Sequence, residues 1–190
     1  MADFAADALA LADHLSWQRF ALVGVSFGGM VAQELAIAAP ERATRVVLAC
    51  TSSGGAGGSS APLHEVFSLP QAQRAERLIG LVDARTATDA LLRAQISERL
   101  AAVLVDPDAG ARQQLEARRH HDTFARLGRI TAPTLVAGGR YDELAPLANS
   151  RALCSAIAGA HLGVFEGGHA FLDQDASAWP ALAAFLSSGD

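Results

Sequence analysis

A strand, a sharp turn and a helix are predicted for residues 20–39, which begin Phe-Ala-Leu-Val-Gly-Val-Ser-Phe-Gly-Gly. Apolar and β-branched residues come first, then a Gly-x-Ser-x-Gly turn, then a largely apolar run that ends before Pro40. Ser26 stands at the centre of the turn, between Gly24 and Gly28. We expect both glycines to be required, because in so tight a turn a side chain would collide with the strand or the helix. The turn would then expose the Ser26 hydroxyl at a helix N-terminus.

The composition indicates one globular domain. With 190 residues, of which 51% are hydrophobic, the chain is long enough to bury a core. All 15 cationic residues are arginines, which excludes Schiff-base chemistry on lysine and the lysine of a phosphate-binding P-loop. The net charge of -5, with acidic and basic residues interspersed, argues against nucleic acid as a partner.

The N-terminus and the two cysteines indicate the compartment. Residues 1–4 carry no basic region, and no long apolar run follows, so we expect neither a signal peptide nor a membrane span. We therefore expect a cytoplasmic protein without a membrane partner. Cys50 and Cys154 lack Cys-x-x-Cys spacing and lie among apolar residues, so two buried free thiols are favoured over a disulfide.

Short apolar strands alternate with helices along the chain, which predicts an α/β fold with a parallel sheet. Strands are expected at residues 20–25, 45–50, 133–138 and 162–165, and core helices at residues 2–15, 29–39, 146–158 and 171–186. The first helix is expected to pack its apolar face against the strand that leads to Ser26. This face consists of Phe4, Ala8, Leu11 and Leu15.

Residues 61–127 have helical patterning only and are expected to form a lid. The lid would be inserted into a core made of residues 1–60 and 128–190. Its helices are expected at residues 71–82 and 88–105, with a third opened by Asp106-Pro107 as cap and first turn.

Two further loops each follow a predicted strand at its carboxyl end, where an open parallel sheet places its ligand crevice. Gly-Arg-Tyr-Asp, ending at Asp142, follows the third strand, and Gly-Gly-His, ending at His169, follows the fourth. A serine hydroxyl needs a base within hydrogen-bond reach, and the base needs a carboxylate that holds its tautomer. Ser26, His169 and Asp142 could supply these three groups at one edge of the sheet.

Each of these residues also has a plainer interpretation. Ser26 could be a structural serine of the turn, Asp142 a turn or helix-capping carboxylate with Glu143 as a competing acid, and His169 a solvated loop residue. A metal site at residues 120–122 (His-His-Asp) is not favoured, because adjacent residues of a helix point about 100° apart. A carboxylate-binding role for an arginine of the expected lid, such as Arg74, is less favoured than packing and solvation.

With these three motifs in this order, the chain resembles serine hydrolases of the α/β-hydrolase superfamily, in the style of lactonases and esterases that carry a helical lid. The resemblance implies a three-layer, mostly parallel sheet and cofactor-free, metal-free chemistry. It implies that Ser26 is the nucleophile, His169 the general base and then acid, and Asp142 the orienting carboxylate. The backbone N–H of Phe27 would be one donor of the oxyanion hole. The implied substrate is a small carboxylic ester, lactone or thioester.

Members of this superfamily normally carry several strands and a helix before the helix that here begins at residue 2. A loop among them supplies the second oxyanion donor. Without them, the sheet is expected to be truncated, with the strand Phe20–Val25 as an apolar edge that invites pairing with another chain. The alternative function is therefore a non-catalytic remnant, or a C-terminal fragment, whose edge strand mediates self-association or binds a partner.

Overall fold

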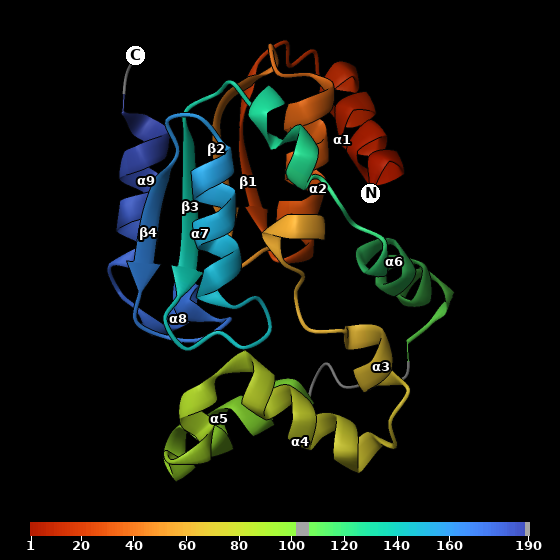
Figure 1. Cartoon of the computed structure of the whole chain (residues 1–190), viewed down its shortest axis with the longest axis vertical. Helices are drawn as coiled ribbons and strands as arrows, with labels where there is room; N and C mark the ends of the chain where they lie inside the picture. The colour runs from red at the N-terminus through yellow and green to blue at the C-terminus, as the bar shows by residue number, and fades with distance from the viewer. Residues whose placement is uncertain (102–106, 189–190) are drawn as a thin grey trace.

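The computed structural model describes residues 1–101 and 107–188, and a parallel four-stranded sheet lies at its centre (Figure 1). The strands are β1 (Phe20–Val25), β2 (Ala43–Ala49), β3 (Thr134–Gly139) and β4 (His161–Phe165), and they follow one another in this order across the sheet. In the register, Val47 of β2 stands opposite both Val23 and Leu135. The predicted α/β fold with a parallel sheet is confirmed.

Helices cover both faces of the sheet (Figure 1). On one face lie α2 (Phe27–Ala38), α7 (Leu147–Ala156) and the 3-10 helix η3 (Phe124–Arg129), and on the other lie α8 (Phe171–Gln174) and α9 (Ala178–Ser187). Leu48 and Val136 pack into the first core, whereas Val47 and Ala137 pack into the second. The central strands read as continuous apolar runs because both of their faces are buried.

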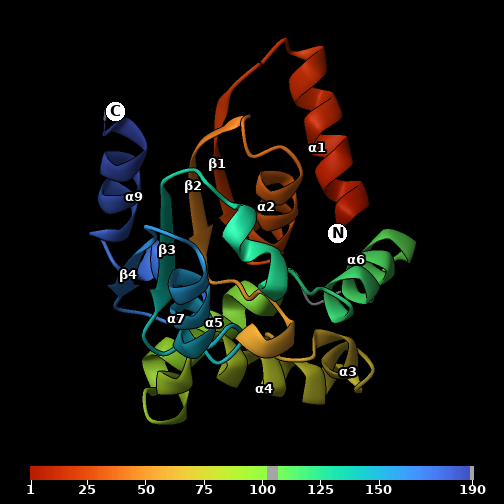
Figure 2. The same cartoon turned by 45° about the horizontal axis from the view of Figure 1, so that its top comes forward.

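Helix α1 (Ala2–His14) packs beside α2 rather than against β1, as Figure 2 shows. Its buried residues are Ala5 and Ala12, whereas Leu11 is 59% and Leu15 44% exposed. The prediction of its apolar face is therefore wrong for Leu11 and Leu15, whereas Phe4 and Ala8 are partly buried. Helix α1 contacts α2 through Phe4, whose ring meets the ring of Phe27 edge-on with the centroids 5.3 Å apart.

The segment between β2 and β3 is mainly helical, and α4 and α5 lie beyond the carboxyl ends of the strands (Figures 1 and 2). Its elements are η1 (Gly55–Gly57), α3 (Leu63–Phe67), α4 (Gln71–Val82), η2 (Ala84–Ala87), α5 (Ala90–Ala101) and α6 (Ala109–Arg119), followed by η3. Helix α4 has the predicted bounds. Within the described ranges, no helix is both long and apolar enough to cross a membrane.

Several predicted helix ends differ from the structure. The helix expected at 88–105 begins at Ala90, and residues 102–105 lie outside the described residues, as does the predicted cap Asp106. The cap of α6 is instead Asp108, whose carboxylate accepts a hydrogen bond from the N–H of Ala111 at 2.7 Å.

The closing helix predicted at residues 171–186 is broken into α8 and α9 at Asp175. The Asp175 carboxylate accepts hydrogen bonds from the backbone N–H groups of Glu166 and Ser177, at 2.8 and 2.9 Å. An aspartate that bonds nearby backbone groups competes with a continuous helix, so the chain turns here.

Both cysteines are free thiols. Cys50 is buried at the end of β2, and burial raises the pKa of its thiol to about 12. Cys154 is only partly buried, and its Sγ donates to the carbonyl oxygen of Ala160 at 3.3 Å. The expectation of a buried thiol therefore holds for Cys50 alone.

Candidate active site

Ser26 occupies the turn between β1 and α2 in a strained backbone conformation. Its φ is 54° and its ψ is -115°, a region that residues with side chains rarely adopt. The neighbouring chain holds it on both sides. The Ser26 N–H donates to the carbonyl of Ala49 at 2.8 Å, and the Ser26 carbonyl accepts from the hydroxyl of Thr51 at 2.7 Å. The end of β2 thus supports the strained turn that presents the serine side chain.

Gly24 and Gly29 are the glycines that the turn requires. A Cβ on Gly24 would lie 2.5 Å from the Gly28 oxygen, and a Cβ on Gly29 would lie 2.6 Å from the Cβ of Thr51. At Gly28, a Cβ would meet no heavy atom of the described residues within 4 Å apart from its chain neighbours and the backbone of its own helix. The prediction is right for Gly24 and wrong for Gly28, because position 28 of the first helical turn faces open space and position 29 faces the chain after β2.

Ser26, His169 and Asp142 form a continuous chain of hydrogen bonds. The Nε2 atom of His169 lies 2.9 Å from Ser26 Oγ, and its Nδ1 atom lies 2.8 Å from Asp142 Oδ2. Because a carboxylate only accepts, Nδ1 carries the proton and Nε2 accepts from the serine hydroxyl. The structure thus brings together three side chains from the loops after β1, β3 and β4.

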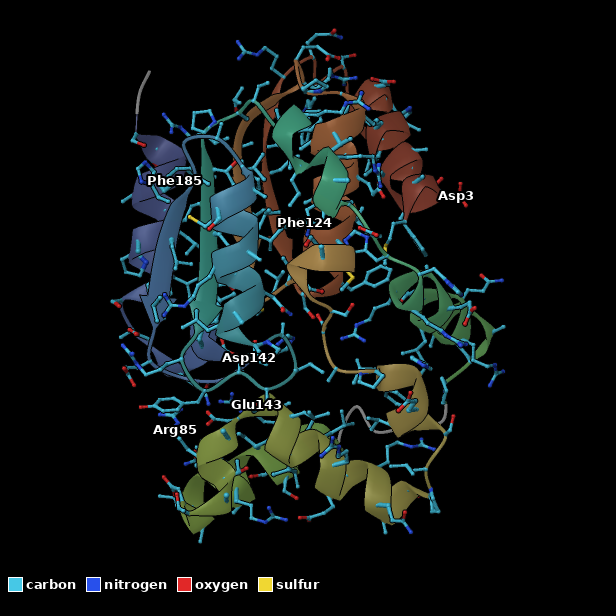
Figure 3. The ribbon with its side chains drawn as sticks, viewed as in Figure 1. Asp3, Arg85, Phe124, Asp142, Glu143 and Phe185 are labelled. Atoms are coloured by element: carbon cyan, nitrogen blue, oxygen red, sulfur yellow. The ribbon has the colours of Figure 1, made fainter. Side chains whose placement is uncertain are left out.

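The Asp142 carboxylate is buried and held in place by its own loop. Its Oδ1 accepts from the N–H groups of Leu144 and Ala145, both at 2.8 Å. Glu143, the competing acid, is exposed, and both residues lie where the sheet meets α4 and α5 (Figure 3). The carboxylate that bonds His169 is therefore that of Asp142, not that of Glu143.

Residues 81–84, at the end of α4, join the loops that carry Asp142 and His169. The His169 N–H donates to the carbonyl of Val82 at 2.6 Å, and two further main-chain hydrogen bonds reach the Asp142 loop. The contact is so close that a Cβ on Gly168 would lie 2.0 Å from the Val82 oxygen. Position 168 therefore requires glycine for this approach.

The buried Asp83 side chain extends this junction. It accepts hydrogen bonds from the backbone and guanidinium of Arg85 and, at 2.9 Å, from the amide of Gln174. The Gln174 Oε1 atom in turn accepts from the N–H of Gly168 at 2.8 Å, next to His169. Burial alone would raise the pKa of Asp83, but the hydrogen bonds from Arg85 and Gln174 outweigh it and hold that pKa below its ordinary value.

Ser26 and Phe27 line a pocket of about 470 Å³. The other described lining residues come from α3, from α6 and from the two residues before α6. They are the apolar Leu63, Phe67, Pro107, Ala111 and Leu115 and the polar Asp108, Gln114 and Arg118. This size and largely apolar lining are typical of small-molecule sites. The Phe27 N–H is the first of α2, where backbone N–H groups lack an acceptor within the helix.

The sequence patterns do not predict that Asp83, Gln174 and Arg118 lie at the site. An Asp-x-x-Thr pattern after α4 marks Asp83 as the cap of η2, but its partner Gln174 is 91 residues away in the sequence. Within the described parts of the chain, no group of three or more His, Cys, Asp and Glu side chains is arranged to hold a metal ion.

Known proteins resemble the chain in sequence. The profile of a family described as alpha/beta hydrolase fold matches residues 1–79. A 2-hydroxy-6-oxononadienedioate/2-hydroxy-6-oxononatrienedioate hydrolase from Cupriavidus pinatubonensis is 31% identical over 175 residues, which cover 81% of this chain and 56% of the relative. The 3-oxoadipate enol-lactonase 2 of Acinetobacter baylyi is 30% identical over 166 residues, which cover 86% of this chain and 61% of the relative.

A solved hydrolase from Pseudomonas aeruginosa superposes with a TM-score of 0.78 at 28% identity, over 97% of this chain and 71% of that one. By contrast, the chain spans less than two thirds of the length of the Cupriavidus hydrolase and of the Acinetobacter lactonase. The parallel sheet, the strand-turn-helix at Ser26 and these matches agree with one another. The chain belongs to the α/β-hydrolase superfamily.

Proposed function

We propose that the chain is a serine hydrolase that cleaves a small carboxylic ester, lactone or thioester through an acyl-enzyme on Ser26. The observation that carries this proposal is the hydrogen-bond chain from Ser26 Oγ through His169 to Asp142, with distances of 2.9 and 2.8 Å, at the wall of an apolar pocket. The names of the relatives support it. They include a lactonase and a hydrolase of a dienedioate.

The reaction would proceed in two halves. Ser26 Oγ attacks the carbonyl carbon while its proton passes to His169 Nε2, and the Phe27 N–H donates to the developing oxyanion. The imidazolium then gives this proton to the leaving alkoxide or thiolate, which leaves the acyl group on Ser26. Water, deprotonated by His169, attacks the acyl-enzyme and releases the acid. Throughout, Asp142 accepts from Nδ1–H and stabilises the charged imidazole.

Helices α3 and α6 would act as the lid, because their side chains face Ser26 across the pocket. A closed pocket excludes water and strengthens every electrostatic interaction inside it. The core and the lid would then meet at the pocket. The lid segment proposed here, residues 61–127, ends within η3, whose Leu127 packs into the core of the sheet.

Trapping the acyl-enzyme tests this proposal directly. The purified chain is mixed briefly with a para-nitrophenyl ester, quenched in acid and weighed by mass spectrometry. We expect one added acyl group on the peptide that contains Ser26. An acyl group on another residue, or hydrolysis without any acylated protein under conditions of a pre-steady-state burst, would contradict this route.

Asp83 is expected to be a positioning residue for His169. Replacing Asp83 with asparagine removes the anchor of Gln174 and, through it, of the loop at Gly168. We expect kcat for ester hydrolysis to fall about 10- to 100-fold with little change in KM, since small displacements of reacting groups cost rates of this order. Glu98→Gln on α5 removes the same charge from an exposed site and should leave kcat unchanged.

Asp83→Asn should also change how the thermal stability of the fold depends on pH. The pKa of Asp83 is lower in the folded chain than the ordinary 3.8, so its carboxylate stabilises the fold at neutral pH and loses this contribution as the pH falls below 3.8. The difference in Tm between wild type and Asp83→Asn should therefore be largest near neutral pH and shrink below that value. A difference that grows on acidification would refute the assigned contacts.

The sheet edge supports a second candidate function, which is self-association. Strand β1 ends the strand order, and its exposed residues Val23 and Val25 are 45% and 40% accessible. Phe20 and Ser26 donate their N–H groups toward β2, so the backbone groups of the odd-numbered residues between them point away from the sheet. An apolar edge of this kind pairs readily with a strand of another chain, and we take a second copy of this chain as the partner.

Light scattering after size-exclusion chromatography tests this pairing. We expect a dimer whose fraction rises with protein concentration, and a monomer for Val23→Lys, because an edge lysine opposes pairing. Leu91→Lys, at a site 71% exposed on α5, is the matched control and should remain dimeric. A wild-type monomer at every concentration, or a dimer that persists in Val23→Lys, would speak against the edge as an interface.

A further inference from the structure

Arg118 stands in the same pocket as the proposed nucleophile. It lies in the last turn of α6 and lines the pocket together with Ser26 and Phe27. Its Nη1 donates to the carbonyl of Ala61 at 2.6 Å, which fixes the side chain across the gap between α6 and the start of α3. The guanidinium has five N–H donors, and this bond uses one of them.

The charge of Arg118 has no counterion among the described residues. Within residues 1–101 and 107–188 it forms no ion pair, and burial is the cause that lowers its pKa, to about 10. At neutral pH it therefore remains a cation. Neighbouring arginines differ, since Arg126 pairs with Glu34 at 2.7 Å and Arg119 lies 3.9 Å from Glu116. A partly buried cation that has no counterion among the described residues is costly unless another anionic group neutralises it.

The pocket is electrostatically asymmetric. The other charged group in its described lining is Asp108, which caps the opposite end of α6. Ten residues of helix separate the two, or roughly 15 Å. Apolar side chains such as Phe67 and Leu115 lie in the wall with them. A ligand with one negative group and an apolar body would match the end of this pocket that holds Arg118.

We propose that Arg118 is an anion-binding residue and that the preferred substrate carries a carboxylate apart from the bond that is cleaved. That the bound anion belongs to a substrate rests on the proposed function. The binding of an anion by Arg118 does not. A guanidinium receives a carboxylate through two parallel hydrogen bonds, and an apolar surrounding strengthens both. The carboxylate would orient the substrate so that its scissile carbonyl lies at Ser26.

Calorimetric binding tests the site without turnover. Phenylbutyrate and its isosteric neutral amide, phenylbutanamide, are titrated into the wild-type chain. We expect the acid to bind about 10- to 100-fold more tightly, the range of a charge-assisted hydrogen bond. Arg118→Met should remove this preference, Arg118→Lys should keep part of it, and Arg119→Met, which removes an exposed charge one residue away, should leave it intact. A melting curve for each variant establishes that it is folded.

Three results would overturn the inference. These are equal binding of acid and amide to the wild type, no binding of either, or an acid preference that survives in Arg118→Met.

Kinetics with a matched pair of esters tests the role of Arg118 separately from the proposed serine chemistry. The mono-para-nitrophenyl ester of glutaric acid ends in a carboxylate where para-nitrophenyl pentanoate ends in a methyl group.

For this ester pair, Arg118→Met should lower kcat/KM for the glutarate ester about 10- to 100-fold and spare the pentanoate. If neither ester is hydrolysed while the acid preference in binding persists, the proposed function fails and the anion site stands. If both esters are hydrolysed and Arg118→Met has the same kcat/KM as the wild type for each of them, the serine chemistry stands and the assignment of Arg118 fails.

Discussion

Replacing Ser26 with alanine is expected to lower kcat for ester hydrolysis by about 10⁴- to 10⁶-fold, the loss seen when a serine nucleophile is removed. The Oγ atom that lies 2.9 Å from His169 Nε2 is the atom that becomes acylated in the proposed mechanism. Initial rates with a para-nitrophenyl ester, corrected for hydrolysis by the buffer, give the ratio of kcat between the wild type and Ser26→Ala. KM should change little, because the pocket walls remain.

A matched control separates loss of the nucleophile from a general effect of the substitution. Ser155 is exposed on α7, and its hydroxyl donates to the carbonyl of Arg151 within the same helix. Ser155→Ala should therefore retain wild-type kcat. If Ser26→Ala kept full activity, the reaction would take place elsewhere on the chain, and the proposed function would be wrong.

Replacing Asp142 with asparagine is expected to lower kcat by about 10⁴-fold while the chain stays folded. An asparagine amide can present an N–H to His169 Nδ1, which favours the imidazole tautomer that has its proton on Nε2. That tautomer cannot accept the proton of Ser26. The measurement is kcat at saturating ester, with circular dichroism to establish the fold.

Glu143→Gln is the control for Asp142, since it removes the adjacent carboxylate at an exposed position. It should leave kcat within a factor of about two, as expected of a surface change away from the reacting groups. The assignment would be reversed if Glu143→Gln were inactive and Asp142→Asn active.

Local patterns were enough to predict the central part of this fold. The apolar run before Ser26, the turn and the following helix each have their own signal, and the strands at Thr134–Gly139 and His161–Phe165 were predicted to within one residue at each end. The loops with Asp142 and His169 could be placed at one edge because parallel strands end together. The roles of these residues stay predictions, but their proximity follows from the topology.

Contacts between distant segments could not be predicted from such patterns. Helical spacing cannot tell whether α1 meets a strand or a helix, so Leu11 and Leu15 were expected inside and lie outside. Similarly, Gly28 and Gly29 look alike in the sequence, and only the position of Thr51 distinguishes them. Asp83 and Arg118 gain their surroundings from Gln174 and Ser26, each about 90 residues away in the sequence.

Labelling with a fluorophosphonate probe tests most directly whether Ser26 is an activated nucleophile. The wild-type chain and Ser26→Ala are incubated with the probe, and the mass of the intact protein is measured over time. We expect one adduct on the wild type, none on Ser26→Ala, and a labelling rate that falls steeply in Asp142→Asn, since an activated serine depends on its histidine and carboxylate. A folded wild-type chain that acquires no adduct, or an adduct that also forms on Ser26→Ala, would contradict this expectation.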